Sequence, residues 1–194
     1  SISSSLQDGD AEGVAAGVGQ ALAAGVPARE VLERGLLAGM DVVGQRFRSH
    51  EIFLPDVLLA ARAMYSGLDL LKPLLEGEGL PSRGTVVIGS VRGDLHDIGK
   101  NLVGIMLRGA GFQVVDLGHD VAPERFVDAA VESGAAVIGM SALLTTTMTA
   151  MQEVVDLVRA RGLSGRVRTI VGGAPVSADF ARSIGADAHG YDAV

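Results

Sequence analysis

One short segment of the chain, Gly93-Asp94-Leu95-His96-Asp97-Ile98-Gly99, gathers residue types that could do chemistry. His96 stands two residues after Asp94, and at this spacing in an extended loop the two side chains point to the same side. A carboxylate that accepts from one imidazole nitrogen fixes the tautomer and leaves the other nitrogen with a free lone pair. Such an imidazole is suited to bind a metal or to act as a general base. Glycines at both ends let the backbone approach a bulky ligand.

A plainer interpretation of the same segment stays open: Asp94 or Asp97 caps the following helix, and His96 is only a polar loop residue. The elements on either side decide how much weight the first interpretation has. A strand-like run, Thr85–Ser90, comes before the segment and a helix-like run, 98–110, comes after it. In doubly wound α/β proteins, the carboxyl end of a strand is where the ligand site lies.

The rest of the second half of the chain repeats this alternation of strand and helix. Near-continuous apolar strands between helices predict a parallel sheet covered on both faces, with the flavodoxin-like, Rossmann-like strand order 2-1-3-4-5. The expected strands are Thr85–Ser90, Gln113–Leu117, Ala136–Met140, Val167–Val171 and a fifth near Ala188, and the expected helices are 98–110, 123–133, 147–161 and 177–184. The loops after strands 1, 3 and 4 then open on one edge, where they form a single crevice.

The first half of the chain predicts a small helical bundle. Val14, Val18 and Leu22 form one apolar stripe, a second helix starts at Pro27, and a third starts near Pro55. The segment 76–84 is polar and rich in glycine and proline, so we expect the domain boundary there. The predicted domains are residues 1–80, helical, and residues 84–194, α/β.

Composition narrows the classes of function. A net charge of −7 argues against nucleic acid or an anionic membrane as the main partner. The absence of cysteine excludes disulfides, thiolate metal sites and cysteine nucleophiles, and fits a cytoplasmic protein. The longest apolar run, 135–144, is too short to span a bilayer.

Several motifs in one order give the chain a family resemblance. Asp94-x-His96-x-x-Gly99, Lys100-Asn101, Asp116-Leu117-Gly118, Ser141-Ala142-Leu143 and Gly172-Gly173 together resemble the cobalamin-binding domain shared by methionine synthase and the corrinoid methyl-carrier proteins. The resemblance covers nearly the whole chain. It implies a base-off, His-on cobalamin in which His96 is the metal ligand below the cobalt. The displaced nucleotide tail would then enter a slot beside the sheet.

The resemblance also implies roles for further residues. Ser141 and Leu143 would meet the nucleotide tail, Gly172 and Gly173 would make room for it, and Thr147 would extend the Asp94–His96 hydrogen-bond chain. Each has an ordinary alternative, because Ser141 could cap a helix and the glycines could form a simple turn. The full set of expected cofactor contacts in this domain is Gly93, Asp94, Leu95, His96, Asp97, Ile98, Gly99, Ser141, Leu143, Thr145, Thr147, Gly172 and Gly173.

In the helical domain, Phe47, Leu54 and Val57 resemble the cap helices that cover the reactive face of cobalamin in the methionine synthase family. Apolar side chains there would shield a cobalt-bound methyl group from water. The alternative is that these three residues belong to the bundle core. For His50, in the same region, two interpretations stay open: it is a surface residue, or it is a ligand or sensor on the upper face of the cobalamin.

The function that the resemblance implies is that of a non-catalytic methyl carrier. A substrate-specific methyltransferase would load a methyl group onto cobalt, and a second methyltransferase would pass it to an acceptor such as tetrahydrofolate or a thiol; a reductive activation protein is a further expected partner. Three alternatives remain: a cobalamin-dependent mutase, a light or ligand sensor that uses cobalamin, and a module that binds another ligand such as a flavin. Under this resemblance, the choice of methyl donor belongs to the partner enzyme.

Overall fold

The computed structural model describes residues 1–75 and 82–191. It divides into two compact units, one formed mainly by residues 1–82 and the other mainly by residues 83–193. Of the predicted boundary segment 76–84, residues 76–81 lie outside the described residues. Within the described part of the chain, no helix is both long enough and apolar enough to cross a membrane.

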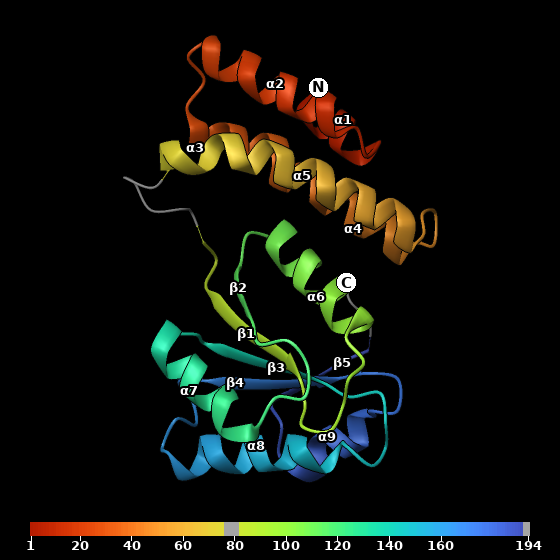
Figure 1. The fold of residues 1–194 in the computed structure, drawn as a ribbon, viewed down its shortest axis with the longest axis vertical. Coiled ribbons are helices and arrows are strands. Elements are labelled where there is room, and N and C mark those ends of the chain that lie inside the picture. Colours follow the sequence, from red (N-terminus) through yellow and green to blue (C-terminus); the bar gives the residue numbers. More distant parts are fainter. Residues whose placement is uncertain (76–81, 192–194) are drawn as a thin grey trace. The chain divides into compact units, whose positions relative to one another are not determined.

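The first unit is entirely helical (Figure 1). Its elements are α1 (Ile2–Gln7), α2 (Ala11–Ala23), α3 (Ala28–Val31), the π-helical turn η1 (Leu32–Leu37), α4 (Ala38–Arg48) and α5 (Leu54–Leu75). The predicted helix from Pro27 is present as α3, η1 and α4, which follow one another without a break. Helix α1 lies in the region predicted to be helical but is not one of the three helices located from the sequence.

Small residues let these helices pack closely. A Cβ added to Gly67 of α5 would lie 2.9 Å from side-chain atoms of both Val14 and Leu36. Val14 and Leu36 are fully buried, so the glycine is what allows α5 to approach α2 and η1. The Asp10 side chain caps α2 by accepting from the Gly13 N–H at 2.9 Å.

The second unit is a five-stranded parallel sheet with the order β2-β1-β3-β4-β5, as the alternating pattern predicted. Helix α6 covers one face, and α7, α8 and α9 lie on the other (Figure 1), the arrangement that right-handed crossovers require. The strands are β1 (Thr85–Ser90), β2 (Gln113–Asp116), β3 (Val137–Ser141), β4 (Arg168–Gly172) and β5 (Ala188–Gly190), and the helices are α6 (Ile98–Gly109), α7 (Pro123–Ser133), α8 (Thr149–Ala160) and α9 (Ala178–Ile184).

The register of the three central strands places their ends side by side. Ser90, Ser141 and Gly172 end β1, β3 and β4, and Ser141 is paired with both of the others. Strands β3 and β4 each run one residue further than the apolar pattern predicted. The three loops that follow them therefore start at the same level of the sheet.

Candidate functional site

The loop between β1 and α6 presents His96 at the carboxyl edge of the sheet. One backbone hydrogen bond ties the start of this loop to β3, since the Val91 N–H donates to the Ser141 carbonyl at 3.0 Å, and a second closes a turn within the loop, since the Asp94 N–H donates to the Val91 carbonyl at 3.0 Å. At Gly93 the backbone has a φ of +83°, which strongly favours glycine. The loop is thus a folded turn with a defined path.

The buried carboxylate of Asp94 connects the residues of the site by hydrogen bonds. Its carboxylate has no exposed surface and accepts five hydrogen bonds. Oδ1 accepts from the His96 Nδ1 at 2.8 Å and from the His96 N–H at 3.1 Å. Oδ2 accepts from the Leu143 N–H at 2.8 Å, the Leu144 N–H at 3.1 Å and the Thr147 hydroxyl at 2.8 Å. One carboxylate therefore joins the loop after β1 to the loop after β3.

These donors keep Asp94 ionised. Burial by itself raises the pKa of Asp94, but the hydrogen bonds from the Leu143 N–H, the Thr147 hydroxyl and His96 outweigh burial and hold the pKa well below its ordinary value. An ionised carboxylate can only accept, so the His96 Nδ1 must carry the proton of this bond. The neutral imidazole then has its lone pair on Nε2.

Thr147 completes the chain of hydrogen bonds. Its hydroxyl lies 2.8 Å from both the Asp94 Oδ2 and the Leu144 carbonyl. A hydroxyl has one proton to donate, and the charged oxygen is the stronger acceptor. The side chain is almost fully buried, so the Thr147–Asp94–His96 chain is shielded from water up to the imidazole ring.

The imidazole itself is accessible. The His96 side chain is 51% exposed, and among the described residues no hydrogen-bond partner faces Nε2. Nor do the described residues contain any group of three or more His, Asp or Glu side chains that could hold a metal ion. The described residues therefore offer His96 no ready-made set of protein metal ligands.

Exposed apolar side chains occur in both of the loops that meet at Asp94. Leu95 and Ile98 flank His96 along the chain and are 65% and 73% exposed, and Leu143 and Leu144 are 45% and 43% exposed beside Asp94. Exposed apolar side chains grouped around a polar centre mark a ligand site. Gly99 leaves additional room for a ligand, because a Cβ at this position would meet only open space. These features fit a large, partly apolar ligand with a metal at its centre.

The remaining predicted residues of this unit lie around the same edge. Ser141 ends β3 beside Ser90, and Thr145 is exposed in the loop between Leu144 and Thr147. Gly173, with a φ of +124°, packs so close to the Ala142 carbonyl that a Cβ would overlap it, so this glycine is required by the backbone itself.

The prediction omitted three residues that contribute to the site. Leu144 supplies one of the N–H groups to Asp94. The buried Ser90 hydroxyl donates to the His96 carbonyl at 2.6 Å, and the Asp120 carboxylate accepts from the Gly93 N–H at 2.7 Å. No residue type signals the Leu144 N–H, because every residue except proline offers this donor. The Asp120 contact depends on the pairing of the segment after β2 with β1, and the Ser90 contact depends on the path of the loop after β1.

The three residues assigned to the helical unit differ in exposure. Phe47 and Leu54 are half-buried, whereas Val57 is fully buried in the helical core. The structure thus agrees with the core alternative for Val57 and does not place it on the surface of its unit. Phe53 is the most accessible apolar side chain in this segment, at 66% exposure.

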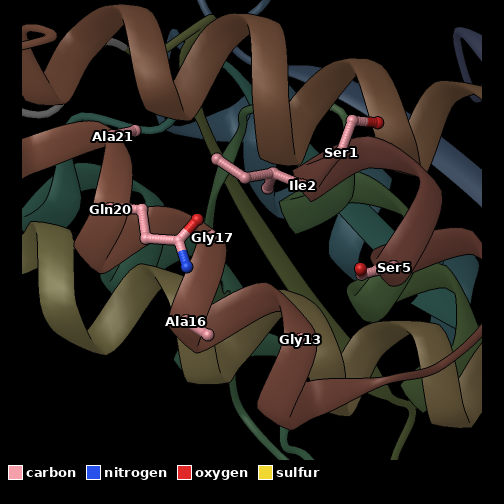
Figure 2. A pocket seen from close by; sticks show the side chains of 8 residues that line it. All are labelled: Ser1, Ile2, Ser5, Gly13, Ala16, Gly17, Gln20 and Ala21. Carbon is pink, nitrogen blue, oxygen red and sulfur yellow. The ribbon is translucent and has the colours of Figure 1, made fainter. Parts of the chain in front are cut away.

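The helical unit also contains an open pocket of about 430 Å³ between α1 and α2 (Figure 2). Side chains of Ser1, Ile2 and Gln20 line it, together with small residues such as Gly17. It has no titratable side chain and none of the predicted site residues. We assign no chemistry to it.

Comparisons with known proteins bear on both units. A family model described as a B12 binding domain matches residues 84–194, and a second model with the same description matches residues 1–72. Trimethylamine corrinoid protein 1 of Methanosarcina mazei is 45% identical over 190 residues, which are 97% of this chain and 88% of that protein. The dimethylamine corrinoid protein of Methanosarcina barkeri is 46% identical over 165 residues, 84% of this chain and 78% of that protein.

Solved structures agree with these matches. The methanol:cobalamin methyltransferase complex of Methanosarcina barkeri contains a chain with a TM-score of 0.92 and 34% identity, and the match covers 99% of this chain and 73% of that one. A cobalamin-binding protein from Desulfitobacterium hafniense has a TM-score of 0.80 at 34% identity, with 99% of this chain and 91% of that chain covered.

Proposed function

This chain belongs to the family of corrinoid proteins built from B12 binding domains, and on that premise we propose that it is a methyl carrier that binds its corrinoid base-off, with the His96 Nε2 as the lower ligand of cobalt. When bound, the corrinoid supplies the cobalt atom that accepts and gives up the methyl group. The chain supplies ligation, orientation and shielding.

One observation carries the proposal. The His96 Nδ1 donates to a buried, ionised Asp94, which leaves Nε2 as a free lone pair on an accessible ring. A histidine that ligates a metal through one nitrogen commonly donates the other N–H to a carboxylate. The exposed Leu95, Ile98 and Leu143 would contact the macrocycle around this nitrogen. The residues present therefore fit the cofactor.

The other expected contacts have distinct tasks in this proposal. Ser141, Leu143 and Thr145 would line the path of the nucleotide tail, and the close backbone approach at Gly172 and Gly173 would shape its far wall. Phe47 and Leu54 would shield the upper face of the corrinoid. Val57 would support them only indirectly, because it is buried in the helical core.

The proposed partners are two methyltransferases and a reductive activation protein. The relatives are named as trimethylamine and dimethylamine corrinoid proteins, and a structural neighbour comes from a methanol:cobalamin methyltransferase complex. We therefore propose that the first partner is a methyltransferase acting on a small methylated compound such as a methylamine or methanol. The second would pass the methyl group to tetrahydrofolate or a thiol.

Reconstitution with hydroxocobalamin tests the ligation directly. Wild type and His96→Ala are loaded, desalted and compared by visible spectroscopy, and the Co(II) forms are examined by EPR after labelling of histidine with 15N. Wild type should retain cobalamin and show coupling to a histidine nitrogen, and this coupling should vanish in His96→Ala but persist in the control His119→Ala, an exposed histidine. Failure of wild type to retain any corrinoid would reject the proposal.

A further inference from the structure

The segment that follows β2 runs alongside the loop that presents His96. The Ser90 N–H donates to the Gly118 carbonyl at 2.9 Å, the Val121 N–H donates to the Ser90 carbonyl at 3.0 Å, and Val91 forms a parallel bridge with Val121. This segment, 116–121, thus continues the pairing of β2 and β1 beyond the ends of both strands. It contains two carboxylates, Asp116 and Asp120, whose contacts lie on opposite sides of His96 in the sequence.

Asp120 holds the residues before His96. Its Oδ1 accepts from the Gly93 N–H at 2.7 Å, and its own N–H donates to the Asp94 carbonyl at 3.0 Å. Asp120 makes these contacts with a backbone φ of +53°, a conformation that residues other than glycine, asparagine and aspartate rarely adopt. Because this conformation is unfavourable for most residues, the contacts around Asp120 are what hold its backbone there.

Asp116 holds the residues after His96. Its carboxylate accepts from the Lys100 Nζ at 2.5 and 2.7 Å, and the Lys100 side chain, in the first turn of α6, is only 3% exposed. The same carboxylate accepts from the Gly118 N–H at 2.9 Å. The start of α6 is therefore fastened to the same segment that grips Gly93.

We propose that Asp116 and Asp120 form a two-point clamp that positions His96 for ligation. Both are positioning residues, since they act through Lys100 on one side and Gly93 on the other. Between the two points, the Ser90 hydroxyl fixes the His96 carbonyl at 2.6 Å. The inference rests on the proposed role of His96 as a ligand.

The physical reason is preorganisation. A seven-residue connection between β1 and α6 without these contacts would sample many backbone conformations, and ligand binding would have to select one of them at an entropic cost. With both ends fastened, the carboxylate of Asp94 and the ring of His96 hold one relative position before any ligand arrives. The clamp should therefore strengthen ligation by His96 and leave contacts elsewhere on the cofactor unchanged.

A thermodynamic cycle tests the clamp through Asp120, whose exposed side chain can be changed without disturbing a core. Hydroxocobalamin dissociation constants are measured by equilibrium dialysis for Asp120→Gly, Asp120→Ala and Asp120→Asn, in the wild-type and the His96→Ala backgrounds. Glycine removes the acceptor but tolerates the positive φ, alanine removes the acceptor and is strained, and asparagine keeps an acceptor and tolerates the φ. The matched control is Asp128→Ala, an exposed carboxylate on α7 that is paired with Arg161, the residue just after α8.

We expect Asp120→Gly and Asp120→Ala to raise the dissociation constant about tenfold when His96 is present, and less than twofold when it is absent. Asp120→Asn and Asp128→Ala should match wild type. Equal losses in both backgrounds, or a loss with alanine but none with glycine, would overturn the clamp, because Asp120 would then act on general stability or through strain alone.

A second readout uses the protein without cofactor. Amide hydrogen exchange of Gly93, followed by NMR, should be about tenfold faster in Asp120→Gly than in wild type and unchanged in Asp120→Asn. Unchanged exchange in Asp120→Gly contradicts the clamp. If wild type binds no cobalamin, or if His96→Ala binds it as tightly as wild type, the proposed ligation fails, and the exchange measurement still decides the clamp.

Discussion

At Asp94, both carboxylate oxygens are engaged, and the donors come from two loops that are about fifty residues apart in the chain. The Leu143 N–H and the Thr147 hydroxyl reach it from the loop after β3, while His96 reaches it from its own loop. The motif Asp94-x-His96 could be found in the sequence, because two residues of extended chain bring the side chains to one side. The Leu143 and Leu144 N–H groups could not, because backbone donors carry no sequence signal.

Replacement of Thr147 by valine tests the worth of the buried donor. Thr147→Val keeps the shape of the side chain but withdraws one hydrogen bond from an ionised carboxylate, so we expect a loss of about 2 kcal/mol in the free energy of unfolding. Urea unfolding followed by circular dichroism measures it. Thr147→Ser should keep most of the stability, and Thr145→Val, at an exposed position in the same loop, should change it little. If Thr147→Val leaves the free energy of unfolding unchanged, the Thr147 hydroxyl donates to the Leu144 carbonyl instead.

Among the elements, the strands of the sheet were predicted to within a residue, whereas the first helix was expected only as part of a helical region and was not located individually. Helix α1 (Ile2–Gln7) contains three serines and has little helical signal of its own. It forms because Leu6 is fully buried against its neighbours, which is a tertiary effect. Likewise β3 extends to Ser141 because its partners Ser90 and Gly172 continue the ladder, although a serine adds nothing to an apolar pattern.

The ion pair between Lys100 and Asp116 attaches the start of α6 to the end of β2. Lys100→Met should destabilise the protein by about 2 kcal/mol, somewhat less than the 3–5 kcal/mol typical of a broken buried pair, because the Asp116 side chain is 25% exposed and keeps some solvation. Urea unfolding measures the change.

The matched variant for this pair is Lys100→Met combined with Asp116→Asn, which keeps an acceptor for the Gly118 N–H but carries no charge. The double variant should recover part of the lost stability, because no unpaired carboxylate remains. If the double variant is less stable than Lys100→Met alone, the unpaired Asp116 carboxylate is not the cause of the loss.

For the whole molecule, two carboxylates link stability to pH. Burial raises the pKa of Asp187, but hydrogen bonds from the Thr169 N–H and Arg168 outweigh it, so the pKa is lowered, as it is for Asp94. In both cases the unfolded chain binds more protons than the folded protein at acidic pH. Their contribution is therefore complete above about pH 5 and is lost as the pH falls through the ordinary carboxyl pKa toward the lowered folded values.

We expect the urea midpoint to fall between pH 6 and pH 4, and to fall less in Asp187→Asn, which keeps an acceptor for the Thr169 N–H but cannot titrate. Urea unfolding followed by circular dichroism at pH 4 and pH 6 measures the midpoints of wild type and of Asp187→Asn. Asp179→Asn, an exposed carboxylate on α9, is the control and should follow wild type. A midpoint that is the same at pH 4 and pH 6 in wild type would contradict the assigned pKa directions.

The sequence by itself determined the class of the protein and the centre of its site. Alternating apolar strands and helices predict a parallel sheet of known order, and Asp94 and His96 are close in the chain, so their contact needs no long-range information. Only the tertiary structure decided which groups surround this pair. The Asp120–Gly93 and Leu144–Asp94 hydrogen bonds span 27 and 50 residues. Such partners are set by the register of neighbouring strands and the paths of the loops beyond them, which the order of residue types does not encode locally.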